Sequence, residues 1–243
     1  MQFFRAINSV KAMTFDLDDT LYNNEPIIRQ AEAALNTHLK QYHPKAAALT
    51  PTHWQQLKRD AITANPTYSS DMGKLRLAVL NAALIHDIPP QDTHTLDAAV
   101  QACFDCFYHA RSEFDLADDV HKTLSILSEN MTLVGITNGN VNADQIGITP
   151  YFDTILHAST SRPMKPSRAM FDEAASFIGD APENILHVGD NIIKDVYGAI
   201  NAGFQSAWFA CNREMHLPRE RASVLPHVAL DSVSYTHLTL PTN

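Results

Sequence analysis

Short apolar runs alternate with longer helical patterns through most of the chain. The runs favour β-structure and cover residues 11–17, 131–136, 152–157, 185–188 and 206–209, with a further short run at 227–230. Helical patterns follow at 119–129, 167–178 and 193–202, and we expect a short helix after residue 136. Strands that alternate with helices predict right-handed crossovers and a parallel sheet. We therefore expect an α/β fold, with a Rossmann-like parallel sheet and helices on both faces.

The pattern changes between residues 23 and 112, where helical periodicity continues without a convincing strand. Prolines interrupt it at His43-Pro44, Thr50-Pro51, Asn65-Pro66 and Pro89-Pro90. Because proline ends or kinks a helix, this block predicts four helices. It follows the first strand directly, so we expect an inserted all-helical cap over the carboxyl edge of the sheet. The predicted domains are a catalytic core, residues 1–22 and 113–232, and a helical cap, residues 23–112.

The final segment, residues 233–243, does not contribute to this prediction. Its sequence VSYTHLTLPT resembles the translation of a sequencing-library adapter. We interpret the segment as a non-native tail and leave it out of the fold, with a native polar tail as the alternative.

Charge and composition exclude several kinds of partner. The formal net charge is -9 and the basic residues are scattered, which argues against a nucleic-acid partner. No apolar stretch approaches the roughly 20 residues that span a bilayer, and the N-terminus lacks a signal-peptide pattern. We therefore expect a cytoplasmic protein with no membrane partner. The sequence does not indicate an oligomeric state.

Metal-binding motifs of the cysteine and histidine type are not evident. Cys103 and Cys106 form a CxxC, but they lie in a helical apolar pattern with no second pair, which favours small buried hydrophobes over zinc or redox chemistry. The 12 histidines show no ligand spacing that indicates a metal site.

The first predicted strand ends on a pair of carboxylates, Asp16 and Asp18, in the sequence FDLDDT. Two carboxylates two residues apart can divide the work of phosphate-ester cleavage. Asp16 would attack phosphorus, while Asp18 would protonate the leaving oxygen and then activate water. The D-x-D-x-T pattern alone is only moderately specific.

Polar residues also follow the second strand and a later loop. The hydroxyl of Thr137 and the backbone N–H groups near Asn138 and Gly139 could hold phosphoryl oxygens, although a Gly-containing turn explains the same residues. Lys165 could offset negative charge in the transition state, although a single lysine is commonly a solvated one. These residues are the predicted binding site for a phosphoryl group.

An acidic pair, Asp190 and Asp195, follows the apolar run ILHV. Hard cations take oxygen ligands and keep several waters, so the pair suits Mg²⁺, with Asp190 as the direct ligand. We expect Asp195 to orient Lys165 or a bound water, with helix capping as its structural alternative. An acidic protein that handles an anionic ester needs such local charge neutralisation.

The four clusters, in the order Asp pair, Thr, Lys and Asp pair, resemble the motif set of the haloacid dehalogenase superfamily. The resemblance implies that Asp16 is the nucleophile, Asp18 the general acid/base, and Thr137 and Lys165 the phosphoryl-binding residues. It also implies a Mg²⁺ site formed by Asp16, the main-chain carbonyl of Asp18, and Asp190. Since dehalogenases lack an acid at the position of Asp18, the resemblance favours a phosphatase or a phosphomutase.

The likeness extends to one bacterial subfamily, through the stretches MTFDLDDTLYNN, TNGN, ILHVGD and LPH. It implies a small-molecule phosphate ester as substrate: 5-amino-6-(5-phospho-D-ribitylamino)uracil of riboflavin biosynthesis, FMN, or both. Arg76 is the predicted substrate contact from the cap. Further cap-side candidates are Tyr22, Asn24, Lys74, Tyr108 and Arg111, each of which could equally be a packing or solvent-facing residue.

Other functions stay open at this point. A broad-specificity sugar-phosphate or nucleotide phosphatase would carry the same motifs. A catalytically silent phospholigand-binding protein could use the same pocket, but binding alone does not require the acid/base Asp18.

Overall fold

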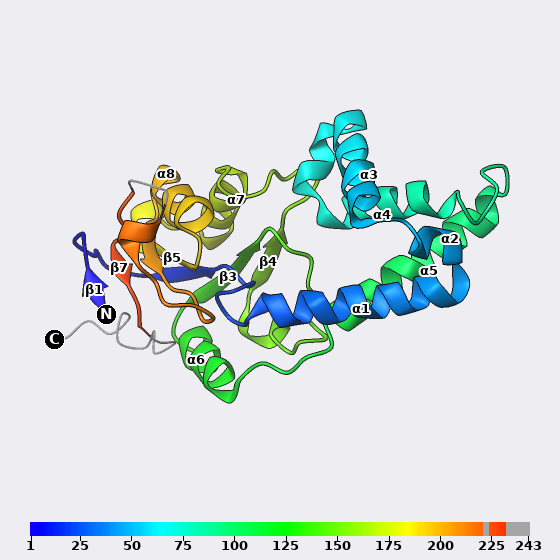
Figure 1. Ribbon diagram of the computed structural model, residues 1–243. Coiled ribbons are helices and arrows are strands. Elements are labelled where there is room, and N and C mark those ends of the chain that lie inside the picture. Colours follow the sequence, from blue (N-terminus) through cyan, green and yellow to red (C-terminus); the bar gives the residue numbers. More distant parts are fainter. Residues whose placement is uncertain (221–223, 232–243) are drawn as a thin grey trace.

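The carboxyl ends of three adjacent parallel strands meet at the centre of the sheet. The computed structural model describes residues 1–220 and 224–231, and these contain one seven-stranded sheet in the order β1-β7-β6-β5-β2-β3-β4 (Figure 1). The strands are β1 Gln2–Phe3, β2 Ala12–Phe15, β3 Thr132–Thr137, β4 Thr154–His157, β5 Ile185–Gly189, β6 Gln205–Trp208 and β7 Val228–Ala229. β2 lies between β3 and β5: its residue Phe15 pairs with Gly135 on β3 and with Val188 on β5.

Helices cover the two faces of this sheet. Side chains alternate between faces along a strand, so Leu133 packs with α6 while Val134 and Ile136 pack with α7. The core helices are α6 Asp118–Ser128, α7 Ala169–Ile178 and α8 Gly198–Asn201, the last preceded by a π-helix at Ile192–Tyr197. Figure 1 shows α6 on one side of the sheet and α7 and α8 on the other. The predicted α/β fold with a helix-covered, mostly parallel sheet is confirmed.

The segment between β2 and α6 folds as a group of helices beside the sheet (Figure 1). These are α1 Asn24–Tyr42, α2 Pro44–Ala47, α3 Pro51–Ala64, α4 Met72–Leu84 and α5 Thr93–Arg111, with a 3₁₀ helix at Pro66–Ser70. Their apolar side chains form a cluster separate from those of the sheet. Four of these helices begin at a residue whose side-chain oxygen accepts a backbone N–H of the first turn. These N-cap residues are Asn23 for α1, Thr50 for α3, Asp71 for α4 and Asp92 for α5. The domain boundaries given above stay predictions.

Several elements differ from the sequence prediction. The four helices expected between residues 23 and 112 are five, because the proline that ends α1 begins the additional short helix α2. β1 was not predicted, and it pairs antiparallel with β7, so the sheet is not wholly parallel. The short helix expected after residue 136 is wrong: the chain forms turns there, and a 3₁₀ turn occurs only at Thr149–Tyr151. Side-chain oxygens accept three of the backbone N–H groups in this segment: Asn142 Oδ1 from Asp144 and Gln145, and Oγ of Ser112, at the end of α5, from Asn142.

Two further predictions concern the membrane and the chain end. Within the described residues, no helix is long and apolar enough to cross a membrane. The predicted non-native tail, residues 233–243, lies outside the part of the chain that the structure describes.

Candidate active site

Asp16 occupies the centre of the carboxyl edge of the sheet. It follows β2 directly, and its backbone N–H donates to the carbonyl of Val188 on β5 at 2.9 Å. Thr137 ends β3 on one side, and Asp190 follows β5 on the other. The topology therefore brings together three of the predicted polar clusters, which are far apart in sequence.

Lys165 ties two of these clusters together. Its ammonium donates to Asp16 Oδ1 at 2.7 Å, to the carbonyl of Ile136 at 2.6 Å, and lies 2.7 Å from Asp195 Oδ1. The lysine is only 2% exposed. Burial opposes its charge, but the two carboxylates outweigh burial and raise the pKa of Lys165. The ammonium is thus a fixed positive charge beside Asp16.

Asn138 holds the backbone of Lys165 in place. Its Oδ1 accepts from the Lys165 N–H at 2.8 Å, and its Nδ2 donates to the Lys165 carbonyl at 3.1 Å. Thr137 is fully buried, and its hydroxyl oxygen accepts from the N–H of Gly139 at 2.9 Å. The side chain of Asn138 is therefore engaged with Lys165 and the Gly139 N–H with Thr137, and the Thr137 hydroxyl can still donate its own proton to an incoming anion.

Two side chains fix the carboxylate of Asp18. Arg111 Nη2 donates to both Asp18 oxygens at 2.9 Å, and the Tyr22 hydroxyl donates to Oδ1 at 2.6 Å. Arg111 ends α5, so this contact joins the helical group to the core. A Cβ on Gly139 would lie 2.4 Å from Asp18 Oδ2, so only glycine permits this approach. The sequence indicated Arg111 only as one of several cap-side candidates, because nothing in its spacing connects it to Asp18, 93 residues away.

The carboxylates of Asp16, Asp190 and Asp195 lie within 4.8 Å of one another. Both oxygens of Asp195 already accept, from Lys165, His187 and the Asn191 N–H. Burial and neighbouring carboxylates raise the pKa of Asp190 to about 7. Burial also raises the pKa of Asp16 well above its usual range, although Lys165 partly opposes this. Hard oxygen ligands and uncompensated negative charge fit a cation such as Mg²⁺.

His187 is a buried part of the site that the sequence interpretation did not single out. Its Nε2 lies 3.2 Å from Asp195 Oδ1 and its Nδ1 lies 2.8 Å from the Thr14 hydroxyl. Since a carboxylate only accepts, Nε2 donates and Nδ1 accepts from Thr14. Burial lowers the pKa of His187, which keeps the ring in this neutral form. Its only sequence signal was a polar residue inside the apolar run ILHV.

A cavity of about 1020 Å³ opens beside Asp18, between the helical group and the sheet. Arg76 lines it, with its guanidinium carbon 3.3 Å from the centre of the Phe107 ring. Burial lowers the pKa of Arg76 to about 10. Other lining side chains are mostly apolar, with one further aromatic ring: Ile28, Leu35, Leu39, Trp54, Leu75, Val79 and Leu80. Arg111, Asn138 and Gly139 line the end near the carboxylates.

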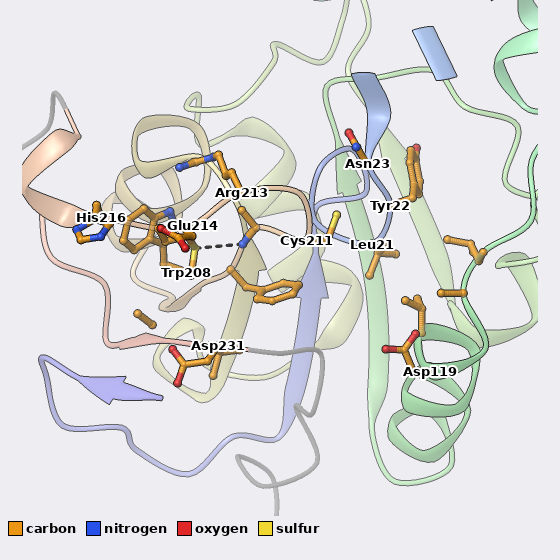
Figure 2. Close-up of a pocket in the computed structure, with 18 of the residues that line it drawn as sticks. Leu21, Tyr22, Asn23, Asp119, Trp208, Cys211, Arg213, Glu214, His216 and Asp231 are labelled. Carbon is orange, nitrogen blue, oxygen red and sulfur yellow. Dashed lines mark hydrogen bonds between the residues drawn. The ribbon is translucent and has the colours of Figure 1, made fainter. Parts of the chain in front are cut away.

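A larger cavity of about 1460 Å³ lies elsewhere, beside α6 and the loop after β6. Figure 2 shows Trp208, Arg213 and His216 on one side of it, and Tyr22 and Asp119 on the other. None of the predicted phosphoryl-binding residues or acidic site residues lines it. The smaller cavity is therefore the candidate active site, because Asp18, Asn138 and Gly139 line it.

Comparisons with known proteins agree with this geometry. A family model described as haloacid dehalogenase-like hydrolase matches residues 10–203. The chain is 31% identical to the 5-amino-6-(5-phospho-D-ribitylamino)uracil phosphatase YigB of Escherichia coli (strain K12), over 96% of this chain and 98% of that protein. It is 26% identical to the N-acylneuraminate-9-phosphatase of Homo sapiens, over 93% and 92%.

Solved structures share the fold. A chain described as a 2-haloacid dehalogenase from Pseudomonas syringae pv. Tomato DC3000 superposes with a TM-score of 0.87 at 30% identity, over 95% of this chain and 97% of that chain. The HAD-hydrolase YfnB from Bacillus subtilis, whose structure is bound to magnesium, superposes at 0.65 with 16% identity, over 96% and 99%. At that identity, the second likeness concerns the fold alone.

Proposed function

We propose that this chain, which belongs to the haloacid dehalogenase-like hydrolases and is a phosphatase of that family, cleaves its substrate through a covalent intermediate on Asp16 with Mg²⁺ as cofactor. The observation that carries the proposal is the pairing of Asp16 with the buried ammonium of Lys165, next to an Asp18 carboxylate held by Arg111 and Tyr22. This arrangement supports separate roles for the two carboxylates, with Asp16 as nucleophile and Asp18 as acid/base group.

The first step forms a bond between an Asp16 carboxylate oxygen and phosphorus, and breaks the bond from phosphorus to the ester oxygen. Asp18 gives its proton to the departing oxygen. In the second step Asp18 takes a proton from water, which attacks phosphorus and releases phosphate from Asp16. Lys165 and the Thr137 hydroxyl, whose oxygen is held by the Gly139 N–H, offset the charge on the phosphoryl oxygens.

Asp16 and Asp190 are the side chains that would hold Mg²⁺, with Asp195 behind them. Because Asp195 has partners on both oxygens, its part in the proposal is to orient Lys165. Bound Mg²⁺ supplies positive charge that offsets the carboxylates and the phosphoryl group. Arg213, 3.7 Å from Asp190, is a weaker counter-charge because it is partly exposed.

Removal of the cation should therefore stop the reaction. After exhaustive treatment with EDTA and removal of the chelate, we expect phosphate release to fall roughly 100-fold or more. Added Mg²⁺ should restore it, while Ca²⁺ should not, because its larger and more flexible coordination shell suits the site less well. Circular dichroism before and after treatment would check the fold. Full activity after chelation would remove Mg²⁺ from the proposal.

The substrate within this proposal is 5-amino-6-(5-phospho-D-ribitylamino)uracil, FMN, or both. The relative from Escherichia coli supports this choice by its name. The cavity also supports it, because about 1020 Å³ exceeds what a phosphate alone needs. Its apolar walls and the Trp54 ring suit a flat ring system, and Arg76 suits carbonyl oxygens of that ring.

A phosphate-release panel would test the substrate. We expect the highest kcat/KM for the ribitylaminouracil phosphate or FMN, above sugar phosphates and nucleotides. Equal, slow turnover of all esters would instead indicate a broad-specificity phosphatase. A 2-haloacid belongs in the panel, because a similar fold carries the name of a dehalogenase. We expect no halide release. A halide needs no proton to leave, whereas the acid/base group Asp18 indicates a leaving oxygen that does need one.

A variant of Trp54 would separate ring recognition from chemistry in the same panel. We expect Trp54→Ala to raise KM roughly 10-fold for ring-bearing esters and little for glycerol phosphate, which has no ring. His53→Ala is the matched control, because His53 is exposed on the same helix. An equal KM increase for glycerol phosphate would contradict a ring contact at Trp54.

A further inference from the structure

Three side chains with metal-ligating atoms meet in the interior of the helical group, away from the carboxylates of the active site. His38 lies near the end of α1, His43 follows that helix directly, and Cys103 lies on α5, which packs against α1. One ligand atom of each lies within 4.8 Å of those of the other two. Figure 1 shows α1 and α5 side by side over this region. Two helices thus contribute to one cluster of nitrogen and sulfur atoms.

The cluster contains a polar atom that has no partner. His43 is 8% exposed, and its buried Nδ1 has no hydrogen-bond partner among residues 1–220 and 224–231. A buried polar atom without a partner is unfavourable, so such an atom calls for an explanation. The charged neighbour Asp87 does not supply one, because its oxygens accept from the N–H groups of Lys45 and Ala46. A cation bound to the ring nitrogen would satisfy it.

The other two side chains are equally available. Cys103 is fully buried and forms no disulfide. The ring of His38 is partly buried and packs on Tyr42 with centroids 4.7 Å apart, which leaves its nitrogens without a hydrogen bond among the described residues. Burial lowers the pKa of His43 and so favours the neutral ring that metals bind.

We propose that His38, His43 and Cys103 bind a divalent cation of the zinc type, at a site distinct from the Mg²⁺ site. One thiolate and two imidazoles suit Zn²⁺ and discriminate against Mg²⁺, which prefers oxygen ligands. Ligand atoms up to 4.8 Å apart need only a small inward movement to share one ion. A water can complete the coordination as the fourth ligand.

Binding converts the Cys103 thiol to a thiolate and releases one proton. Burial raises the pKa of Cys103 to about 11, so the thiol carries its proton before the ion binds, and the ion must displace it. The bound ion would join the end of α1 to α5. It would therefore stabilise the helical group without touching substrate.

Cobalt provides a direct test, because Co²⁺ bound to a thiolate absorbs in the near ultraviolet and carboxylate sites do not. The full chain, freed of metal by chelation, is titrated with Co²⁺ in excess Mg²⁺. We expect a sulfur-to-cobalt band that saturates at one equivalent and disappears when Zn²⁺ is added. No such band in the wild-type protein would overturn the proposal.

Variants assign the ligands. Cys103→Ser and His38→Ala should each abolish the band, whereas Cys211→Ser and His53→Ala, at exposed positions, should keep it. His38→Ala keeps the test decisive if the buried Cys103→Ser variant fails to fold, because His38 is only partly buried. A band that survives in folded His38→Ala would overturn the proposed ligand set.

Thermal unfolding gives an independent measurement. Zn²⁺ in large excess over its dissociation constant should raise the Tm of the wild-type protein on the order of 5 to 10 °C. It should leave the Tm of His38→Ala almost unchanged. An equal rise in both proteins would place the stabilising ion elsewhere and contradict the proposal.

Discussion

Replacing Asp16 with Asn should lower kcat for phosphate release at least roughly 1000-fold while the protein stays folded. An amide oxygen is a poor nucleophile, so the covalent step cannot proceed at a useful rate. The fold should survive because Asn has nearly the same shape, and because Lys165 keeps its contacts with Asp195 and the Ile136 carbonyl. Steady-state phosphate release and circular dichroism measure the two effects.

A second aspartate serves as the control for this variant. Asp172 is exposed on α7, where its carboxylate pairs with Arg168 at the surface. Since such a pair contributes little, Asp172→Asn should retain full activity and stability. Phosphate release from folded Asp16→Asn at a rate close to that of Asp172→Asn would sink the covalent mechanism.

Replacing Lys165 with Met should damage both stability and activity. The change leaves the buried carboxylates of Asp16 and Asp195 without their shared counter-charge, and removes the donor to Ile136. Loss of one member of a buried charge cluster typically costs about 3–5 kcal/mol. We also expect kcat to fall roughly 100-fold or more, because the phosphoryl group loses a fixed positive charge. Urea unfolding and steady-state kinetics check these values.

A double variant separates the two effects. Lys165→Met with Asp195→Asn removes one positive and one negative charge, so part of the lost stability should return. Activity should not return, because the ammonium beside Asp16 is still missing. Lys40→Met, on the exposed face of α1, is the control for a lysine of no special role. Recovery of activity together with stability would show that Lys165 has only a structural role.

The contacts of Asp18 join the helical group to the core. Arg111 comes from α5 and Tyr22 from the loop after β2, so both parts of the protein hold the Asp18 carboxylate. Any movement of the helical group away from the sheet would take Arg111 from Asp18.

Local patterns in the sequence were sufficient for most of the fold. The apolar runs that became β2 to β6 are buried strands, and the helical periodicity between residues 23 and 112 became helices. These patterns are informative because the direction of the side chains repeats every 2 residues along a strand and every 3.6 residues along a helix, whatever the surroundings. β1 could not be predicted in this way, since a two-residue strand carries no periodicity and is defined by its pairing with β7.

The candidate site divides in the same way. Asp16, Thr137 and Asp190 could be predicted to converge, because each follows a strand and the carboxyl ends of parallel strands share one edge. Lys165 had no such local signal, and only the order of the motifs suggested it. Its bridge between Asp16 and Asp195 is a product of packing, as the loop after β4 carries the ammonium into the interior.

Contacts between residues far apart in the sequence could not be predicted from local patterns. Nothing local distinguishes Arg111 from any other arginine at the end of a helix, and His43 and Cys103 belong to no recognisable ligand spacing. Arg111 meets Asp18, and His43 meets Cys103, only when segments distant in the sequence pack together. The sequence alone thus determined the elements, the acidic pairs and the reaction they suit. The tertiary structure decided which cations and carboxylates meet, because those distances depend on long-range packing that no local period encodes.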